Sequence, residues 1–257
     1  MDDGRVTPPP GDALTVRLVG GALSAQALAD LALAAGVHAD GHLYLTDRAG
    51  IELRGVGGDS YDALVDAVKV AGLLPSLPDE PVRDIMVSPL SGRVGGQADL
   101  RTVAARLNEL LRDDPEPADI GDQLLFVLDD GRGDLVDVGL DVGVMAVDAD
   151  AAQLRVGSDQ WGEVIELDDV PTVLRDLARQ ETPLLALNHA RDLRTQVASL
   201  PAPFDVMTQD DGRRLEHVEI PLGDLTHDLA TQVLARARQD VIVTPWHSLL
   251  LVDLEEA

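Results

Sequence analysis

The sequence predicts an α+β fold in which two strand–helix–strand–strand units, one near each end of the chain, pair around an inserted middle segment. Three observations support this prediction. Apolar residues make up 45% of the 257 residues, which is enough for a packed core, and aromatic residues only 2%, so Leu, Val, Ile and Ala must build it. Strand-like alternating segments follow helix-like amphipathic ones. The order of these segments near the N-terminus recurs near the C-terminus.

The first unit begins with an alternating segment, Leu14–Val19, that predicts a strand. A helix is expected to begin after Ser24, whose hydroxyl suits an N-cap, and to stop at Gly36. Two short strands follow, Leu43–Thr46 and Ile51–Arg54. The polar break between these two strands carries an arginine where a tight connection usually has Asn, Asp or Gly.

The middle segment alternates further helices and strands. Its best amphipathic helix is expected over Asp99–Asp113, and a strand is expected in Arg83–Ser88. The Gly-rich stretch Asp129–Asp134 predicts the turn of a hairpin between two strands. Its acidic pairs, like Asp148–Asp150, predict a solvated acidic surface and no metal site. Additional helices are expected over 60–74, from Pro171 onward, and over 185–200.

The last segment repeats the first. Ser24 falls on Thr226 with an offset of 202, and a shortening by four residues brings Thr46 onto Thr244. This internal similarity predicts two half-domains that pair in space, although any two units of this type share some likeness. The predicted organisation is a flexible tail, 1–12; a first half-domain, 13–58; an inserted α/β domain, 59–199; a linker, 200–213; and a second half-domain, 214–257.

Charge and cysteine content exclude several function classes. Lys and Arg number 20 against 46 Asp and Glu, and the net charge of −26 repels a phosphate backbone, so no nucleic-acid partner is expected. Without cysteine, the chain offers no disulfide, no thiolate-bound zinc and no ligand of its own for an iron–sulfur cluster. No apolar run is long enough to span a membrane, and a cytoplasmic location is expected.

Two motifs resemble the nitrite/sulfite reductase superfamily: "LTDRAGIELRGV" (45–56) and "RDIMVSPLSGR" (83–93). Within that superfamily the chain is most similar to precorrin-3B synthase, an oxygenase of cobalamin biosynthesis. That similarity lies in "SPLSGR", in "FVLDDGRGDLVDVGLDVGV" (126–144) and in "TPWHSLLL" (244–251), where the family reads T-P-W-R-S. The resemblance extends from about Val16 to Leu254.

The resemblance implies two ferredoxin-like half-domains that pair into one sheet domain, with an α/β sulfite-reductase-like domain inserted between them. It implies a chain truncated before the family's iron–sulfur domain, whose cysteines hold the cluster. It also implies a sirohaem- or precorrin-like tetrapyrrole as ligand, and a second polypeptide carrying the cluster domain as partner. The family is one of oxidoreductases, but catalysis by this chain is left open. The alternative is a non-catalytic tetrapyrrole-binding or scaffold protein that docks a cluster-bearing partner.

The resemblance also implies four cofactor-binding residues, because a carboxylate-rich macrocycle needs fixed cations. Arg48 matches the family's T-x-R arginine, Arg83 the arginine of R-N-V, and His247 the arginine of T-P-W-R; Arg93 lies in "SPLSGR". Each residue also has a plainer interpretation. Arg48 would be a solvated turn residue, Arg83 an ion-pair partner of Asp84, His247 a packed histidine, and Arg93 a residue that shapes its loop. The two lysines with which the reductases bind their anion are absent around residues 123–125.

Overall fold

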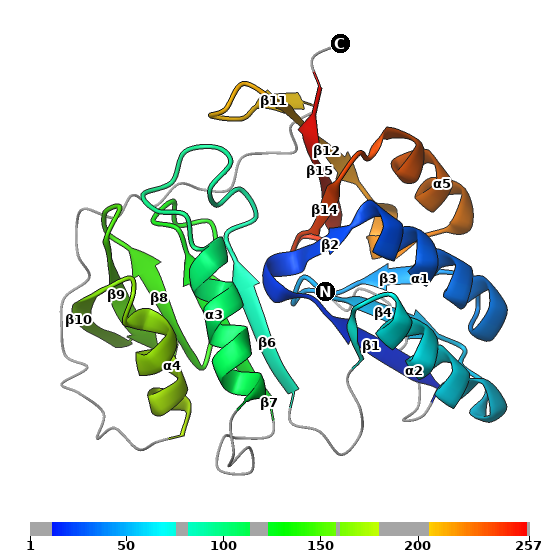
Figure 1. Ribbon diagram of the computed structural model, residues 1–257, viewed down its shortest axis with the longest axis horizontal. Helices are drawn as coiled ribbons and strands as arrows, with labels where there is room; N and C mark the ends of the chain where they lie inside the picture. Colours follow the sequence, from blue (N-terminus) through cyan, green and yellow to red (C-terminus); the bar gives the residue numbers. More distant parts are fainter. Residues whose placement is uncertain (1–11, 76–81, 114–122, 158–159, 180–205, 256–257) are drawn as a thin grey trace. The chain divides into compact units, whose positions relative to one another are not determined.

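A computed structural model describes residues 12–75, 82–113, 123–157, 160–179 and 206–255. The chain divides into two compact units. The first contains the described residues of 1–18, 22–78 and 215–257, and the second those of 19–21 and 79–214 (Figure 1). None of the described helices is both long and apolar enough to cross a membrane. The predicted tail up to residue 11, the helix at 185–200 and the first part of the linker, 200–205, lie outside the described residues.

The first unit contains both predicted half-domains, and they share one element order. The first half consists of β1 (Ala13–Arg17), β2 (Ala22–Ser24), α1 (Ala25–His38), β3 (Leu43–Leu45) and β4 (Ile51–Arg54). The second half consists of β12 (Arg214–Glu219), η4 (Pro221–Gly223), β13 (Asp224–Leu225), α5 (His227–Arg236), β14 (Asp240–Val243) and β15 (Ser248–Leu254). The predicted α+β fold class is confirmed.

The two halves exchange their shortest strands. β2 of the first half pairs with β14 of the second, and Leu23 lies opposite Val241. β13 of the second half pairs with β3 of the first, and Leu225 lies opposite Leu43. The first of the resulting sheets has the order β13-β3-β4-β1-β5, where β5 is Leu74–Pro75, and the second includes the order β12-β15-β14-β2 among its five strands. Each half thus completes the sheet of the other, which is a register that the sequence repeat alone did not predict.

Both helices of the repeat begin after an N-cap residue that carries a hydroxyl group. The Oγ of Ser24 accepts a hydrogen bond from the amide of Ala27 at 3.0 Å, which confirms the predicted N-cap. In the second half, Thr226 Oγ1 accepts from the amide of Leu229 at 3.3 Å. The predicted stop at Gly36 is wrong, because α1 continues for two more residues to His38.

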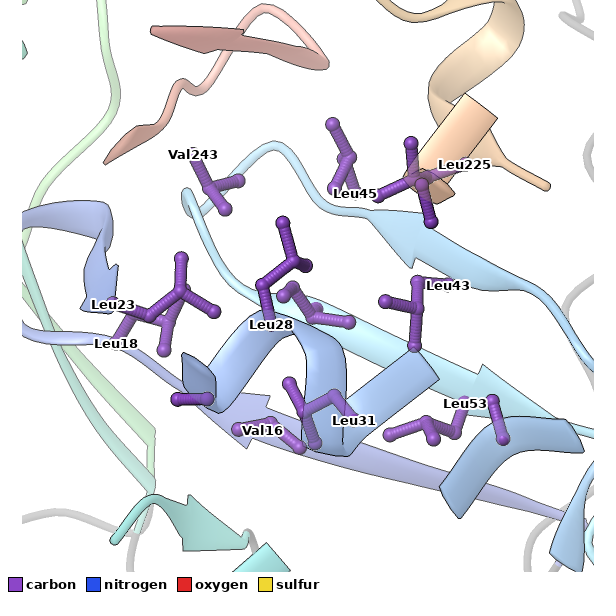
Figure 2. Close-up of a cluster of buried hydrophobic side chains, with 14 of the residues drawn as sticks. Val16, Leu18, Leu23, Leu28, Leu31, Leu43, Leu45, Leu53, Leu225 and Val243 are labelled. Carbon is purple, nitrogen blue, oxygen red and sulfur yellow. The ribbon is translucent and has the colours of Figure 1, made fainter. Parts of the chain in front are cut away.

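One hydrophobic core joins the halves. Figure 2 shows Leu28 and Leu31 of α1 in a buried cluster that also contains Leu225 and Val243 of the second half. All four side chains are buried. Because α1 packs against residues of both halves, the burial of its apolar stripe stabilises their pairing.

Residues 59–78 lie in the first unit, not in the inserted domain to which the sequence interpretation assigned them. Here α2 (Tyr61–Val70) buries Leu64 and Val68 in the same core as α1, and β5 extends the first sheet beside β1. The period of α2 was readable from the sequence. The position of α2 in the fold was not readable, because an apolar stripe shows that a helix packs against something but does not show which sheet it packs against.

The second unit is built on a mixed sheet of order β10-β9-β8-β7-β6. Its strands are β6 (Val82–Val87), β7 (Gln123–Asp129), β8 (Val142–Ala146), β9 (Ala151–Val156) and β10 (Gln160–Glu166). Two helices, α3 (Arg101–Arg112) and α4 (Val170–Ala178), pack their apolar residues on one face of this sheet, and β11 (Val206–Thr208) follows later in the chain.

The stretch Asp129–Asp134 is not the hairpin turn that the sequence predicted. β6, β7 and β8 run parallel, with Leu128 opposite Val87 on one side and Val144 on the other. The chain after β7 therefore crosses over to β8 instead of reversing. This crossover buries Leu135 and Leu140 against the face of the sheet that α3 and α4 leave open.

Candidate functional sites

The turn between β3 and β4 holds Arg48 at its tip. The amide of Thr46 donates to the carbonyl of Gly50 at 3.0 Å, and the amide of Ala49 donates to the carbonyl of Thr46 at 3.1 Å. Thr46 Oγ1 accepts a third bond from the amide of Gly50 at 3.0 Å. Ala49 has a φ of 55°, a left-handed conformation that such a tight turn requires. These bonds fix the backbone on either side of Arg48, whose side chain is half-buried.

The turn between β14 and β15 repeats this geometry. The amide of Thr244 donates to the carbonyl of Ser248 at 3.0 Å, and the amide of His247 donates to the carbonyl of Thr244 at 3.2 Å. His247 has a φ of 59° and therefore occupies the position of Ala49. The position of Arg48 is occupied by Trp246, which is 38% exposed.

Both turns adjoin the same short segment, η4. A Cβ placed on Gly223 would lie 3.1 Å from the carbonyl oxygen of Leu45, which directly precedes the first turn, and 3.2 Å from Cβ of His247 in the second. The structure therefore brings the turns of Arg48 and His247 to one region of the first unit. Gly223 permits this approach because it has no side chain and a φ of 70°.

Arg83 and Arg93 lie in the second unit and are not brought together. Arg83 is the second residue of β6, whereas Arg93 follows the end of that strand. The five steps along the chain from Arg83 to Ser88 alone span about 16 Å of extended strand. Arg83 Nη1 donates to the carbonyl oxygen of Leu111 at 2.7 Å and so caps the last turn of α3. Arg93 is only 7% exposed, and its carbonyl accepts from the amide of Asp210 at 2.8 Å.

A cluster of three buried carboxylates lies where β7 ends. Asp129 and Asp130 are fully buried and Asp134 is nearly so, and one oxygen of each lies within 4.8 Å of the others. The expected solvated acidic surface is therefore wrong for these three residues. Asp129 is held by the chain itself, because Oδ1 accepts from the amides of Gly131 and Gly133 at 3.0 and 2.9 Å and Oδ2 from that of Leu135 at 3.1 Å.

Arginines supply the positive charge of this cluster. Arg132 Nη2 lies 3.1 Å from Oδ2 of Asp130, and its Nε lies 3.8 Å from Oδ2 of Asp134. The guanidinium of Arg155, which is buried in β9 and lies 4.9 Å from the centroid of the Trp161 ring, lowers the pKa of Asp129 by its charge. A guanidinium thus already occupies the place where a bound cation would neutralise these carboxylates.

Asp134 has the weakest set of donors among the three carboxylates. Its Oδ1 accepts from Oγ of Ser88 at 2.6 Å, whereas Asp129 has three amide donors and Asp130 has Arg132. Burial, reinforced by the charges of Asp129 and Asp130, raises the pKa of Asp134 to about 7. Burial also raises the pKa of Asp129 and that of Asp130.

Sequence reasoning missed this cluster although a signal for it was present. Six residues, "DDGRGD", directly follow the apolar run "LLFVL". Read as the carboxyl end of a buried parallel strand, this pattern places polar groups at the sheet edge where α/β folds commonly carry their functional residues. The interpretation of this stretch as a hairpin turn led to a different expectation, because the turn of a hairpin lies in solvent.

The first half of the first unit has a known counterpart. Residues 7–71 match the family described as the nitrite/sulfite reductase ferredoxin-like half domain. This part of the chain is therefore similar to a nitrite/sulfite reductase ferredoxin-like half domain. The match ends one residue after α2, in agreement with the place of that helix in the first unit.

The fold beyond this half domain also has a counterpart among solved structures. The structure is similar to that of the NirA protein of Mycobacterium tuberculosis, with a TM-score of 0.69 and 15% sequence identity. The similarity covers 95% of this chain and 54% of the NirA chain, so the chain spans about half the length of that protein. In total, 27 chains of solved structures are similar to this one. A comparison with curated proteins found no match.

Proposed function

We propose that this nitrite/sulfite reductase-like protein binds a carboxylate-rich tetrapyrrole, of the precorrin or sirohaem type, as a precorrin-3B synthase-like protein of cobalamin biosynthesis. The observation that carries the proposal is the position of Arg48. It lies at the tip of a turn whose backbone bonds fix the residues on both sides, within a half domain of a tetrapyrrole-binding superfamily. A guanidinium on such a support presents two parallel donors to a carboxylate at a low entropic cost.

The residues fit some of the cofactors of the superfamily and not others. With no cysteine, these 257 residues have no thiolate for an iron–sulfur cluster, so a cluster would need ligands from outside them. Recognition of the carboxylates on a macrocycle rim needs only arginine and backbone donors. A bound tetrapyrrole would supply the redox-active ring, and Arg48 would orient one of its carboxylates. Among the four candidates, Arg83 and Arg93 contribute less, because Arg83 caps α3 and Arg93 is buried.

Titration of the purified protein with a partially reduced tetrapyrrole, followed by visible absorbance, tests the proposal. We expect a spectral shift on binding, and an affinity that falls roughly tenfold to a hundredfold in Arg48→Ala, as for the loss of one charge-assisted fork. Arg238→Ala is the matched control, because Arg238 is an exposed arginine at the end of α5 that donates only to the carbonyl of Ala235 among the bonds described. A wild-type protein that leaves the spectrum unchanged would refute tetrapyrrole binding.

A specific observation favours the second candidate function, that of a scaffold docking a cluster-bearing polypeptide. Leu222 in η4 combines a left-handed φ of 57° with an exposure of 89%. Such a conformation is costly for a leucine, and a fully exposed leucine gains nothing from burial in this chain. Trp246 is exposed in the turn whose His247 contacts the neighbouring Gly223.

The internal repeat indicates what could cover this surface. The counterpart of Leu222 in the first half is Gly20, 202 residues earlier, which also has a φ of 60°. Gly20 belongs to the second unit, where a Cβ on it would lie 3.0 Å from Cγ2 of Val87 at the end of β6. We therefore propose that Leu222 and Trp246 contact an α/β domain carried by a second polypeptide.

Photo-crosslinking in the native cell tests this candidate. A photoreactive side chain at position 222 should capture a cysteine-bearing polypeptide, and the same side chain at Val70 on α2, which is also 89% exposed, should not. Equal capture from the two positions would contradict the docking surface. The tetrapyrrole proposal would be unaffected by that result.

A further inference from the structure

Two loops close over each other at the carboxyl edge of the second unit's sheet. The first follows β6 and consists of Ser88–Gln97, which we name the latch loop. The second follows β7 and consists of Asp129–Leu135, which we name the acid loop. Because β6 and β7 are parallel neighbours, both loops leave the sheet at the same edge (Figure 1). Loops at this edge commonly carry the ligand-binding residues of α/β sheets.

Four hydrogen bonds join the loops. Oγ of Ser88 donates to Oδ1 of Asp134 at 2.6 Å, and the other three bonds involve Asp130 or Arg132. The amide of Gln97 donates to the carbonyl of Asp130 at 2.6 Å, and the amide of Asp130 donates to Oγ of Ser88 at 3.0 Å. Arg132 Nη2 donates to the carbonyl of Val94. These bonds place the latch loop directly over the carboxylates of the acid loop.

Glycine makes this closure possible. A Cβ on Gly96 would lie 2.5 Å from Oδ2 of Asp130, and one on Gly131 would lie 2.5 Å from Cγ of Gln97. Both glycines have positive φ values, 80° and 86°. The backbone of the latch loop therefore rests on the carboxylate itself and keeps water away from it.

The charges under the latch loop balance only when one carboxylate carries a proton. Among the described residues, two guanidinium groups act on the three carboxylates, those of Arg132 on the acid loop and Arg155 on β9, whereas Arg93, buried in the latch loop, acts on Asp99. The remaining polar side chain that faces Asp134 is Ser88, which is uncharged. An unpaired charge in a water-excluded site is expensive, and the site can remove it either by taking up a proton or by admitting water.

We propose that the latch loop is a proton-dependent latch, closed over the acid loop while Asp134 is neutral and opened when Asp134 ionises. Asp134 is the proton carrier because, within the described part of the chain, its donors are only the Ser88 hydroxyl and a distant Arg132 Nε. Ionisation adds a third negative charge beneath Gly96 and Gln97, and lifting the latch loop lets water solvate it. Opening also withdraws the amide of Gly95 from Oδ2 of Asp210, at 3.0 Å, and so frees the turn at Gln209–Arg213.

The raised pKa of the Asp134 carboxyl sets the range in which the latch responds. Because that pKa is about 7, the latch is closed at pH 6 and opens progressively toward pH 8. The charges of Asp129 and Asp130 contribute to this range, since each raises the pKa of Asp134. Opening is a local event, because β6, β7 and β8 remain paired below the loops.

Hydrogen exchange of the whole protein tests the latch. After correction for the intrinsic effect of pH on exchange, the protection of the Gly95 and Gln97 amides should fall about tenfold or more from pH 6 to pH 8. Amides in β8 should show no such change. In Asp134→Asn, whose side chain is neutral at every pH, protection should stay constant. In Gly96→Ala the latch should be open at both pH values, because the added methyl group meets Asp130.

Two results would overturn the proposal. One is a wild-type latch loop whose corrected protection is the same at pH 6 and pH 8. The other is an equal fall in Asp134→Asn. If this variant does not fold, the carbon-13 shift of the Asp134 carboxyl in the wild-type protein decides: a titration midpoint below pH 5 would refute a proton held there at neutral pH.

Discussion

Trp246 occupies in the second half-domain the turn position that Arg48 occupies in the first. Both follow a threonine by two residues and precede a residue with a left-handed φ, Ala49 in one turn and His247 in the other. In each turn the amide of that residue donates to the threonine carbonyl, at 3.1 and 3.2 Å. The pseudo-symmetric partner of Arg48 is therefore an aromatic ring, and His247 fills the turn position that has the left-handed backbone.

The hydroxyl of Thr244 should be important for stability. It is fully buried, lies 2.6 Å from Oγ of Ser248, and accepts from the amides of Trp246 and Ser248 at 3.3 Å. Thr244→Val leaves those donors unsatisfied, so the free energy of unfolding should fall by about 1–3 kcal/mol in urea denaturation. Thr231→Val, on the exposed side of α5, is the control and should change it by less than about 0.5 kcal/mol.

Leu222 and its neighbour Gly223 should respond oppositely to substitution. Leu222→Gly removes a left-handed leucine whose side chain is exposed, so stability should be unchanged or rise by up to about 1 kcal/mol. Gly223→Ala places a methyl group 3.1 Å from the carbonyl oxygen of Leu45 and should cost about 1–3 kcal/mol. Thermal unfolding of the two variants measures both effects; a loss of stability in Leu222→Gly would show that the leucine supports the fold.

The helix caps of the two halves should contribute similarly. Ser24→Ala and Thr226→Ala each remove a hydroxyl that accepts from a helix amide, and each should cost about 1 kcal/mol. Ser60 is the matched control, because it precedes α2 without making a side-chain cap bond. Its replacement by alanine should change the denaturation midpoint little. A cost at Ser60 equal to that at Ser24 would argue against the capping explanation.

Stability should fall as pH rises from about 4 to 7, because of Asp134. Its pKa is raised in the folded state from 3.8 to about 7, so between these values the folded protein binds a proton that the unfolded chain has released. The free energy of unfolding therefore decreases by up to roughly 1.4 kcal/mol per pH unit from this group. Asp134→Asn should remove that slope, and the difference between the two denaturation curves isolates it. Parallel curves across this range would contradict the raised pKa.

Much of the fold could be predicted because its signals are local. The alternation of Leu14–Val19, the hydroxyl of Ser24 and the stripe through Leu28 and Leu31 each specify an element within a few residues. The repeat between Thr46 and Thr244 was readable for the same reason. The direction of a strand is not a local property, and so β7 and β8 were predicted as an antiparallel hairpin although they are parallel.

For the candidate residues, too, the sequence indicated which residues to consider, whereas the tertiary packing showed what each one contacts. Motifs pointed to Arg48, Arg83, Arg93 and His247 as a set, but only the packing shows that Arg83 binds the carbonyl of Leu111 while Arg48 stands at a turn tip. The burial of Asp129, Asp130 and Asp134 could not be predicted, because a run of acids is usually solvated. Their burial depends on a latch loop about 40 residues earlier in the chain (Gly96 to Asp134 is 38).

The sequence by itself determined the α+β class, the two repeated halves, their helix caps and the absence of thiolate ligands, because periodicity, capping and composition act over short distances. The tertiary structure alone decided the exchange of β2 and β13, the place of α2, and the closure of the latch loop over three carboxylates. Those features depend on contacts between residues far apart in the chain, where shape and desolvation, and not the pattern of any one segment, select the partner.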